Sequence, residues 1–491
     1  LLALEKRLAE GVMEQDTLRI GAEQEIFLVD SAMRPAPIIL DVLKTANDER
    51  LTTEIGRFNI EANLTPLKFT GNCLSKMEAE LNEVVGIIKK AARNFGGDTV
   101  LCGILPTIQQ SDLIEANLTP NPRYHELNRI LTELHGNQRL IHIKGLDELR
   151  LQLQNTFIEF CNTSFQVHLQ PEIDDYARYY NWAQAVTAPV LASAVNSPVL
   201  MGHNLWHETR LALFQTAVDS RSPAHQARSQ PARVTFGRDW VKDSILEIFH
   251  EDVARFRIIL TRKLEEDSLK VLKAGKIPQL HAWRLHNGTI WRWNRACYGI
   301  TDGKPSLRIE ARFLPSGPSI ADEMANAAFF LGLMAALPKE FGDVTQIMAF
   351  DDAKQNFFST ARFGLQSQIV WFGGRNYRAK TLILEELLPR AKQGLETVGL
   401  DTNDIEKFLG ILQERVSQEK SGARWMLDSL ANMDKRAKTN VRMRSLTAAM
   451  KANQETGQPM HLWKSAEIPE TSDWIDNYKT VEQFMATDLF T

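Results

Sequence analysis

Four short segments of the sequence carry acidic, basic, amide or imidazole side chains at every second position. Because a β-strand directs alternate side chains to opposite faces, the polar groups of each segment are expected to share one face. In chain order they are Glu23 and Glu25; Asn59, Glu61 and Asn63; Ser164, Gln166, His168 and Gln170; and Arg308, Glu310 and Arg312. A sheet with one packed and one solvated face would give the same alternation. Lysine, however, is missing from all four faces, and we interpret them together as one concave site.

The residue types on these faces indicate a site for divalent cations and phosphate groups. Several carboxylates without cysteine favour hard cations such as Mg²⁺ or Mn²⁺, which prefer oxygen ligands. Arginine binds phosphoryl oxygens bidentately and keeps its charge, so Arg308 and Arg312 suit a phosphate. The sequence contains neither G-x-x-x-x-G-K-[ST] nor G-x-G-x-x-G after a strand. If ATP binds, its phosphates must therefore be held by metal ions and arginines on a sheet.

These faces require a sheet, and hydrophobic periodicity predicts the elements that would build it. Strands are expected over residues 18–29, 57–64, 99–105, 164–170, 279–295 and 306–314. Helices are expected over residues 1–16, 75–94, 174–196 (bent or divided at Pro189), 239–273 (as a pair) and 322–337. Beyond residue 381 the pattern is helical almost to the end. We therefore predict a catalytic domain over residues 1–374 and a helical C-terminal subdomain over residues 375–491.

The order of these segments resembles the glutamate-cysteine ligase superfamily, especially its carboxylate-amine ligase branch. The resemblance begins with Gly-Ala-Glu-Gln-Glu at 21–25 and with Glu54 and Glu61 ahead of Pro66. Later stretches similar to this branch are 102–107, 166–168 with 177–178, 188–198 and 308–312, and residues 422–424 resemble the family's C-terminal helices. Each motif is weak alone, but their joint order over residues 18–320 is more specific.

The resemblance implies an α+β, glutamine-synthetase-like fold, with a curved antiparallel sheet, helices on its convex side, and ATP and Mg²⁺ on its hollow face. Family members activate a carboxylate, typically the γ-carboxyl of glutamate, as an acyl phosphate that an amine then attacks. Carried over, the metal ligands would be Glu23, Glu25, Glu54, Glu61, His168 and Glu310, of which only Glu54 is supplied by the resemblance alone. His168 would be either a metal ligand or a phosphate contact.

The same comparison completes the predicted site. ATP contacts are expected from His168, Gln166, Arg308 and Arg312, and the predicted catalytic residues are Arg312, Arg308 and Arg295. Arg312 would hold the transferred phosphoryl group, and Arg295 would anchor a substrate carboxylate. Further candidates for such an anchor are Arg123, Arg210, Arg233 and Arg238. No protein nucleophile is needed, and the base that deprotonates the amine is unassigned.

Composition limits the partners and the location. The chain has 491 residues, with 57 Lys and Arg against 61 Asp and Glu, and a formal net charge of −4, which argues against a nucleic-acid-binding protein. The four cysteines are far apart and form no C-x-x-C, so we expect reduced thiols and a cytoplasmic protein. The apolar runs at 185–201 and 327–337 are broken by proline or too short for a bilayer, so no membrane span is expected.

The sequence leaves several alternatives open. The carboxylate and amine substrates are expected to be small molecules, but the acceptor could be a protein side chain or terminus, and a homodimer is also open. Phosphoryl transfer to a guanidino group, as in guanidino kinases, fits the same fold, as does a relic that binds a nucleotide or a partner without turnover. The hexapeptide Glu-Ala-Asn-Leu-Thr-Pro occurs at 61–66 and again at 115–120, with dissimilar flanks. We infer no duplicated domain from it.

Overall fold

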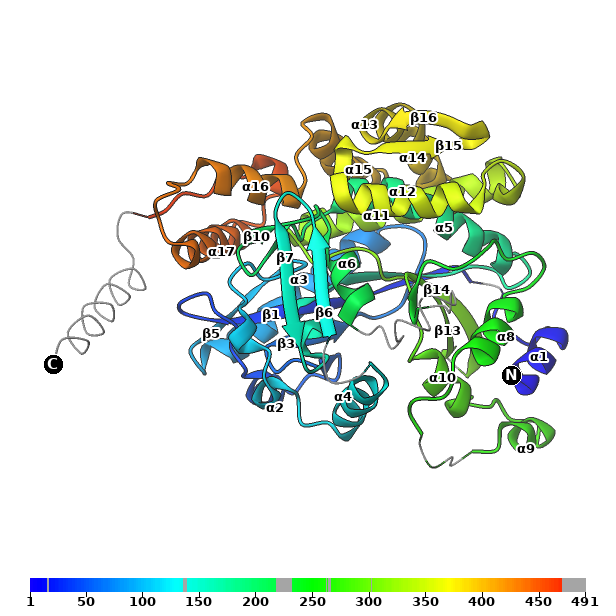
Figure 1. Cartoon of the computed structure of the whole chain (residues 1–491). Helices are drawn as coiled ribbons and strands as arrows, with labels where there is room; N and C mark the ends of the chain where they lie inside the picture. The colour runs from blue at the N-terminus through cyan, green and yellow to red at the C-terminus, as the bar shows by residue number, and fades with distance from the viewer. Residues whose placement is uncertain are drawn as a thin grey trace.

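The computed structural model describes residues 1–15, 17–135, 139–217, 232–261, 263, 266–301 and 303–469. Within these residues, eight strands form one curved sheet at the centre of the molecule, with the order β13–β14–β8–β1–β3–β2, and with β4 and β5 also paired to β1 (Figure 1). Their bounds are β1 Arg19–Asp30, β2 Leu51–Thr53, β3 Asn59–Asn63, β4 Leu67–Lys68, β5 Gly97–Val100, β8 Phe165–Gln170, β13 Asn294–Thr301 and β14 Lys304–Ala311. All these pairings are antiparallel. The predicted α+β class with a curved antiparallel sheet is confirmed.

The two faces of the sheet differ as the alternation predicted. On β1, Ile20, Ala22 and Ile26 are buried, whereas Glu23 and Glu25 remain partly accessible. The same alternation recurs on the neighbouring β3. Ile60 and Ala62 are buried there, whereas Glu61 is partly accessible and Asn63 is exposed. Burying the apolar side chains of one face supplies the main driving force for packing helices against it. The opposite face is therefore left free for the polar groups.

Helices α5 Tyr176–Ala194 and α11 Ile320–Glu340 provide the central helical packing beside the sheet (Figure 1). Almost every residue of both helices is buried. Pro189 lies inside α5, which continues through it as one helix and is not divided. Among the described helices, only α11 is long and apolar enough to cross a membrane by length and composition, but 94% of its most apolar window is buried inside the protein. That environment is typical of a core helix.

Helices α14 Leu388–Thr397 and α15 Thr402–Ser417 pack against α11. The α11–α14 crossing is close because glycines face each other: a methyl group on Gly332 would lie 2.5 Å from the carbonyl oxygen of Ala391. On the α15 side, the buried Arg415 lies 3.7 Å from Asp322 and donates to Asn326 Oδ1 at 2.7 Å. The predicted division at residue 375 stays a prediction, but the helices after it share a hydrophobic core with those before it.

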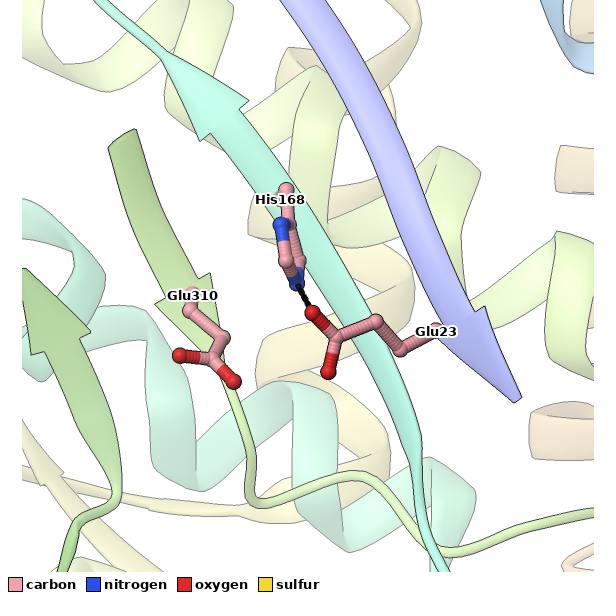
Figure 2. A group of neighbouring side chains, drawn as sticks. All are labelled: Glu23, His168 and Glu310. Carbon is pink, nitrogen blue, oxygen red and sulfur yellow. Dashed lines mark ion pairs between the residues drawn. The ribbon is translucent and has the colours of Figure 1, made fainter. Parts of the chain in front are cut away.

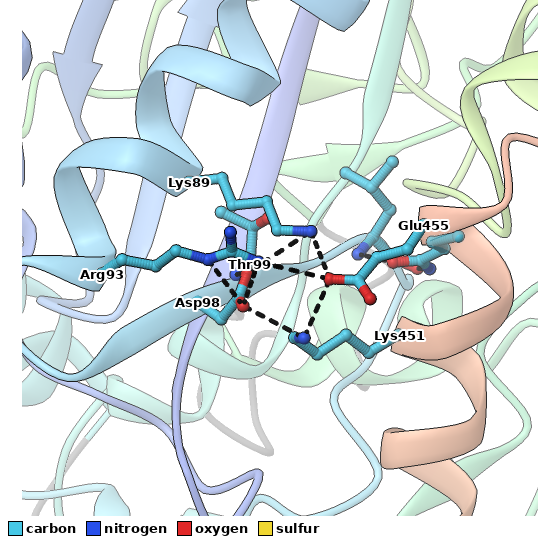
Figure 3. A network of polar contacts seen from close by, with 8 residues as sticks. Lys89, Arg93, Asp98, Thr99, Lys451 and Glu455 are labelled. Carbon is cyan, nitrogen blue, oxygen red and sulfur yellow. Dashed lines mark hydrogen bonds and ion pairs between the residues drawn. The ribbon is translucent and has the colours of Figure 1, made fainter.

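The last described helices, α16 Gly422–Asn432 and α17 Thr439–Glu455, return to the sheet edge. Figure 3 shows α17 meeting α3 Cys73–Arg93 and β5 through a network of charges. Glu455 pairs with Lys89 and Lys451, and Lys451 also lies 3.0 Å from Asp98. Next to them, Gln454 bonds both the N–H and the carbonyl oxygen of Leu101. The segment that follows β5 is thus fixed by the C-terminal part of the chain.

Most predicted elements are confirmed, with four differences. The strand expected at 99–105 is β5, which ends at Val100, so this prediction was wrong for residues 101–105. The helix expected at 1–16 is α1 Leu2–Ala9, which ends before Gly11 at a positive φ of 65°. The pair expected at 239–273 is formed by the shorter helices α8 Leu246–Arg255 and α9 Ser268–Lys273, with part of the segment between them outside the described residues. The strand expected at 279–295 was wrong over its first half, which forms α10 His281–Asn287. The ring of Trp283 in that helix packs on the ring of Phe249, with their centroids 4.6 Å apart. Such a tertiary contact cannot be predicted from the alternation of polar and apolar residues.

The remaining elements complete the described chain. The helices are α2 Ile39–Ala46, α4 Pro122–His135, α6 Thr209–Ala217, α12 Phe350–Phe363 and α13 Ala379–Thr381. Four small two-stranded sheets pair β6 Arg139–Lys144 with β7 Glu148–Leu153, β9 Val199–Leu200 with β10 His203–Asn204, β11 Val234–Thr235 with β12 Trp291–Arg292, and β15 Gln368–Trp371 with β16 Arg375–Arg378. Residues 470–491, the end of the predicted helical region, lie outside the described residues.

Candidate active site

The strand register brings the predicted site residues together on the polar face. Glu25 on β1 is directly opposite Glu61 on β3, and Glu23 is opposite Gln166 on β8. On the other side, His168 of β8 is opposite Glu310 of β14. Two groups of metal-binding side chains result, each with ligand atoms within 4.8 Å of one another. We call them the histidine triad (Glu23, His168 and Glu310) and the glutamate triad (Glu25, Glu54 and Glu61).

The histidine triad links three neighbouring strands (Figure 2). His168 Nε2 lies 3.2 Å from Glu23 Oε1, and Glu310 approaches from the other side. His168 Nδ1 accepts a hydrogen bond from Arg308 Nε at 2.9 Å, which places the imidazole proton on Nε2. An imidazole that binds a metal through Nε2 carries its proton on Nδ1 instead. Metal binding by His168 therefore requires Arg308 to release this nitrogen.

Glu310 is held by two arginines, Arg295 on β13 and Arg312 directly after β14. Arg295 donates to both carboxylate oxygens, at 2.6 and 3.0 Å, and Arg312 Nη1 donates to Oε1 at 2.7 Å. Cys297 Sγ is 2.9 Å from Oε2. Burial alone would raise the pKa of Glu310, but the two guanidinium groups outweigh it and hold that pKa well below its ordinary value. Arg295, predicted as a substrate anchor, is thus engaged with Glu310, while Arg312 also donates to Gln166 Oε1 at 2.7 Å.

The glutamate triad has the opposite electrostatic character. Burial, followed by the negative charge of Glu25, raises the pKa of Glu54 to about 7. Burial and the neighbouring carboxylates of Glu23, Glu54 and Glu25 raise the pKa of Glu61 well above its ordinary value. Clustered carboxylates that repel one another are stabilised by a divalent cation, and their oxygens are the donors that Mg²⁺ prefers. The residues of this triad therefore fit Mg²⁺.

Glu54 reaches the triad from a loop, which the second copy of the repeated hexapeptide holds in place. Thr119 of this copy donates through Oγ1 to the carbonyl oxygen of Glu54 at 2.6 Å, and its N–H donates to Ile55. The first half of the first copy, which contains Glu61, lies on β3, whereas Glu115 of the second copy lies in the short 3₁₀ turn η2 Glu115–Asn117 and is exposed. One sequence thus adopts two conformations.

Two cavities adjoin the triads. The acidic cavity, of about 330 Å³, is lined by five carboxylates, which are the glutamate triad, Glu23 and Glu159, and by Trp291, Trp293 and Phe214. Four arginines, Arg123, Arg210, Arg295 and Arg312, also line it. The cationic cavity, of about 470 Å³, is lined by Arg123, Lys263, Arg284, Arg295, Arg308 and other residues, and no Asp or Glu is among the described residues that line it. Arg123 and Arg295 line both cavities, so the two adjoin at these side chains.

The other four arginine candidates for the carboxylate anchor differ in whether they reach either cavity. Arg210 lines the acidic cavity and is buried; its Nε donates to Glu208 and its Nη2 to the carbonyl oxygen of Phe313, while Nη1 has no hydrogen-bond partner among the described residues. Arg233 instead bonds Thr289 and the backbone of residue 257, away from both cavities, and Arg238 is an exposed side chain 3.8 Å from Glu251. Of the four candidates, only Arg123 and Arg210 reach a cavity.

Sequence reasoning missed Glu159. This residue lies in the 3₁₀ turn η3 Phe157–Cys161, directly before β8. Burial, followed by the charge of Glu25, raises its pKa to about 8. The sequence does contain a signal, because Glu159 is the single charged residue in the otherwise apolar and polar-neutral stretch 154–162.

The sheet, its two triads and the arginines around Glu310 define an enzyme of the glutamine-synthetase-like fold class. The family model for glutamate-cysteine ligase family 2 (GCS2) matches residues 19–449. The chain belongs to this family and is a carboxylate–amine ligase.

Solved structures agree with this fold. Glutamate–cysteine ligase from Francisella tularensis, in complex with AMP, is similar with a TM-score of 0.56 and 12% identity, over 96% of this chain and 99% of that one. A bifunctional glutathione synthetase from Pasteurella multocida is similar with a TM-score of 0.50 and 11% identity, over 93% of this chain and 54% of that one. A search of curated protein sequences found no match.

Proposed function

We propose that this protein is an ATP- and Mg²⁺-dependent ligase that joins a carboxylate, the γ-carboxyl of glutamate, to an amine through an acyl phosphate. The observation that carries this proposal is the pair of triads beside two adjoining cavities, one lined by carboxylates and arginines and the other by cationic side chains without a described carboxylate. The AMP in the similar Francisella tularensis structure supports a nucleotide as the phosphoryl donor. The four free, buried cysteines support the expected cytoplasmic location.

Each triad would hold a divalent cation, Mg²⁺ or, with the same donors, Mn²⁺. The histidine triad would supply two carboxylates and an imidazole, and the glutamate triad would supply three carboxylates. When bound, the metal ions would neutralise charge on the phosphoryl group during transfer. The raised pKa values of Glu54 and Glu61 are consistent with this role. Without a cation, like-charged carboxylates that lie close together are forced to share protons.

The arginines would bind the anionic groups of the substrates. Phosphoryl transfer to a carboxylate brings two anions together, so fixed positive charge is needed where they meet. Arg308 and Arg295 line the cationic cavity, which would take the nucleotide phosphates, and Arg312 with Gln166 would bind the transferred phosphoryl group. Arg210, which is held by Glu208 and keeps one nitrogen without a described partner, would bind a carboxylate of glutamate.

Glutamate-dependent release of ADP or phosphate, measured with a panel of amines, tests the proposal. Glu61→Gln should abolish metal-dependent turnover, because it removes a ligand charge from the glutamate triad. Glu115→Gln is a matched control in the identical hexapeptide, since its side chain is exposed outside the site and should leave turnover unchanged. If no amine stimulates turnover of the wild type, and Glu61→Gln binds Mn²⁺ as the wild type does, the proposal is wrong.

The identity of the product separates the ligase from a phosphotransferase. Mass spectrometry should detect an amide of glutamate, whereas a guanidino kinase would accumulate a phosphorylated small molecule. A panel that includes lysine-containing peptides and free amino acids would also show whether a protein amine can replace a small acceptor. Nucleotide binding measured by calorimetry, without either product, would instead indicate a relic that binds without turnover.

A further inference from the structure

One end of the acidic cavity contains a group of buried hydrogen-bond acceptors that the protein itself does not satisfy. This end is formed by Gly56, Asn59, Glu159, Phe160 and Asn162. A Cβ atom on Gly56 would lie 2.6 Å from Asn59 Oδ1 and 3.2 Å from the Phe160 side chain, so these residues are in close proximity. None of these residues belongs to either triad.

The amide of Asn59 is the clearest unsatisfied group. The residue is only 2% exposed, yet neither Oδ1 nor Nδ2 has a hydrogen-bond partner in the described part of the chain. Leaving buried amide atoms unpaired is unfavourable, and such groups in native proteins are usually paired with water, an ion or a ligand. The Oδ1 atom of Asn162 is likewise buried without a partner.

Glu159 adds a charge to these amides. Its carboxylate receives one long hydrogen bond, 3.4 Å from Asn162 Nδ2, and no ion pair with it is found among the described residues. A buried carboxylate is stabilised by a cation that lies against it. Arg210 and Arg312 act on it only at longer range, because the first donates to Glu208 and the second to Glu310 and Gln166.

We propose that Glu159, Asn59 and Asn162 bind the ammonium group of the amine substrate. An ammonium group offers three hydrogen-bond donors and no acceptor, which matches the carboxylate and the two unpaired amide oxygens. The unpaired Nδ2 of Asn59 needs an acceptor in turn, and the carbonyl oxygen of the neighbouring acyl group would provide one. The inference rests on the proposed function, and it assigns to Glu159 the role of the residue that selects a cationic acceptor.

The acidic cavity also has aromatic walls. Phe214 packs edge-on against Trp291 and Trp293 at 6.0 and 5.7 Å, and all three rings line the acidic cavity. Aromatic faces attract ammonium groups, especially where water is excluded. The cationic cavity has no carboxylate among its described lining residues, so it offers an ammonium group no such partner.

Substitution of Glu159 tests this site with two acceptors of different charge. The probes are the best alkylamine or amino acid in the panel, which is an ammonium ion at neutral pH, and hydroxylamine, which is uncharged. Glu159→Gln should raise the KM for the ammonium acceptor by at least about tenfold and change the KM for hydroxylamine less than about twofold. A parallel change for both acceptors, or no change for either, would overturn the proposal. Glu115→Gln is the matched control.

Two further measurements keep the result interpretable. Asn59→Ala should also raise the KM for the ammonium acceptor, which covers the case in which Glu159→Gln fails to fold; no increase would count against the site. Exchange of the β,γ-bridging oxygen of ATP, measured with glutamate and without an amine, reports acyl phosphate formation alone and should be unchanged in Glu159→Gln. Absence of this exchange in the wild type would overturn the proposed function itself, and with it the assignment of an acceptor site.

Discussion

At the scale of single residues, the shifted pKa of Glu54 links the stability of the protein to pH. Its pKa is raised from an ordinary value of 4.5 to about 7 by burial and by Glu25. Between these values the folded protein binds more protons than the unfolded chain, so stability falls as pH rises from about 5 to above 7. A divalent cation bound to the glutamate triad would remove this repulsion.

We therefore predict that, without divalent cations, the Tm falls between pH 6 and pH 8, and that this fall is smaller in Glu54→Gln. Added Mg²⁺ should raise the Tm of the wild type more at pH 8 than at pH 6, because protons compete with the metal at the lower pH. Differential scanning fluorimetry across pH, with and without Mg²⁺, measures both effects. If Mg²⁺ raises the Tm equally at both pH values, the assignment of the glutamate triad as a metal site is wrong.

The strand period predicts much of the site at this scale, but it fails off the strands. Glu23, Glu25 and Glu61 share an accessible face because β1 and β3 are regular strands. Glu54 follows β2 in a loop and Glu159 lies in a 3₁₀ turn, so neither belongs to a period-2 pattern. Their positions depend on long-range contacts, such as that between Thr119 and the backbone of Glu54.

At the scale of elements, the repeated hexapeptide shows that local sequence does not determine conformation. The copy at 61–66 begins on β3, with Glu61 paired to Glu25, whereas the copy at 115–120 begins in a 3₁₀ turn. Strand propensity is strongly modulated by the neighbouring strand and by burial. The flanking residues differ, and the first copy alone has a central strand beside it. α10 illustrates the same limit, since packing of Trp283 on Phe249 overrides an apparent strand pattern.

The α11–α14 crossing gives a prediction at this scale. Gly332→Ala should destabilise the protein by about 1–3 kcal/mol, because its methyl group would clash with the backbone of Ala391. Gly410→Ala in α15 is the matched control, since a Cβ there meets no atom within 4 Å. Replacing this helical glycine should instead stabilise the protein by about 0.5–1 kcal/mol. Urea denaturation of both variants tests the pair, and equal effects would show that the crossing is looser than the structure indicates.

At the scale of the whole molecule, the site is assembled from residues far apart in sequence. Glu23 and Glu310 flank His168 because β8 lies between β1 and β14 in the sheet, whereas a loop and a 3₁₀ turn bring Glu54 and Glu159 to the cavity that Glu23 lines. Periodicity alone does not define this strand order, which a resemblance to a known family can suggest. The two cavities could not be predicted from the sequence, because the residues that line them come from strands, loops and helices alike.

The C-terminal helices are joined to this assembly closely enough that we expect the chain to unfold as one unit. α14 and α15 cover α11, and α17 is joined to β5 through the ion pair of Lys451 with Asp98. α17 is also joined to α3 through Glu455, whose pKa is lowered to about 2 first by Lys89. That contribution to stability is present above the unfolded pKa of 4.5 and is lost as pH falls toward 2. Near neutral pH, native-state hydrogen exchange in low denaturant should give the same opening free energy for residues 388–417 as for β1 and β8. If residues 388–417 exchange first while β1 and β8 stay protected, the division predicted at residue 375 is a boundary between cooperative units.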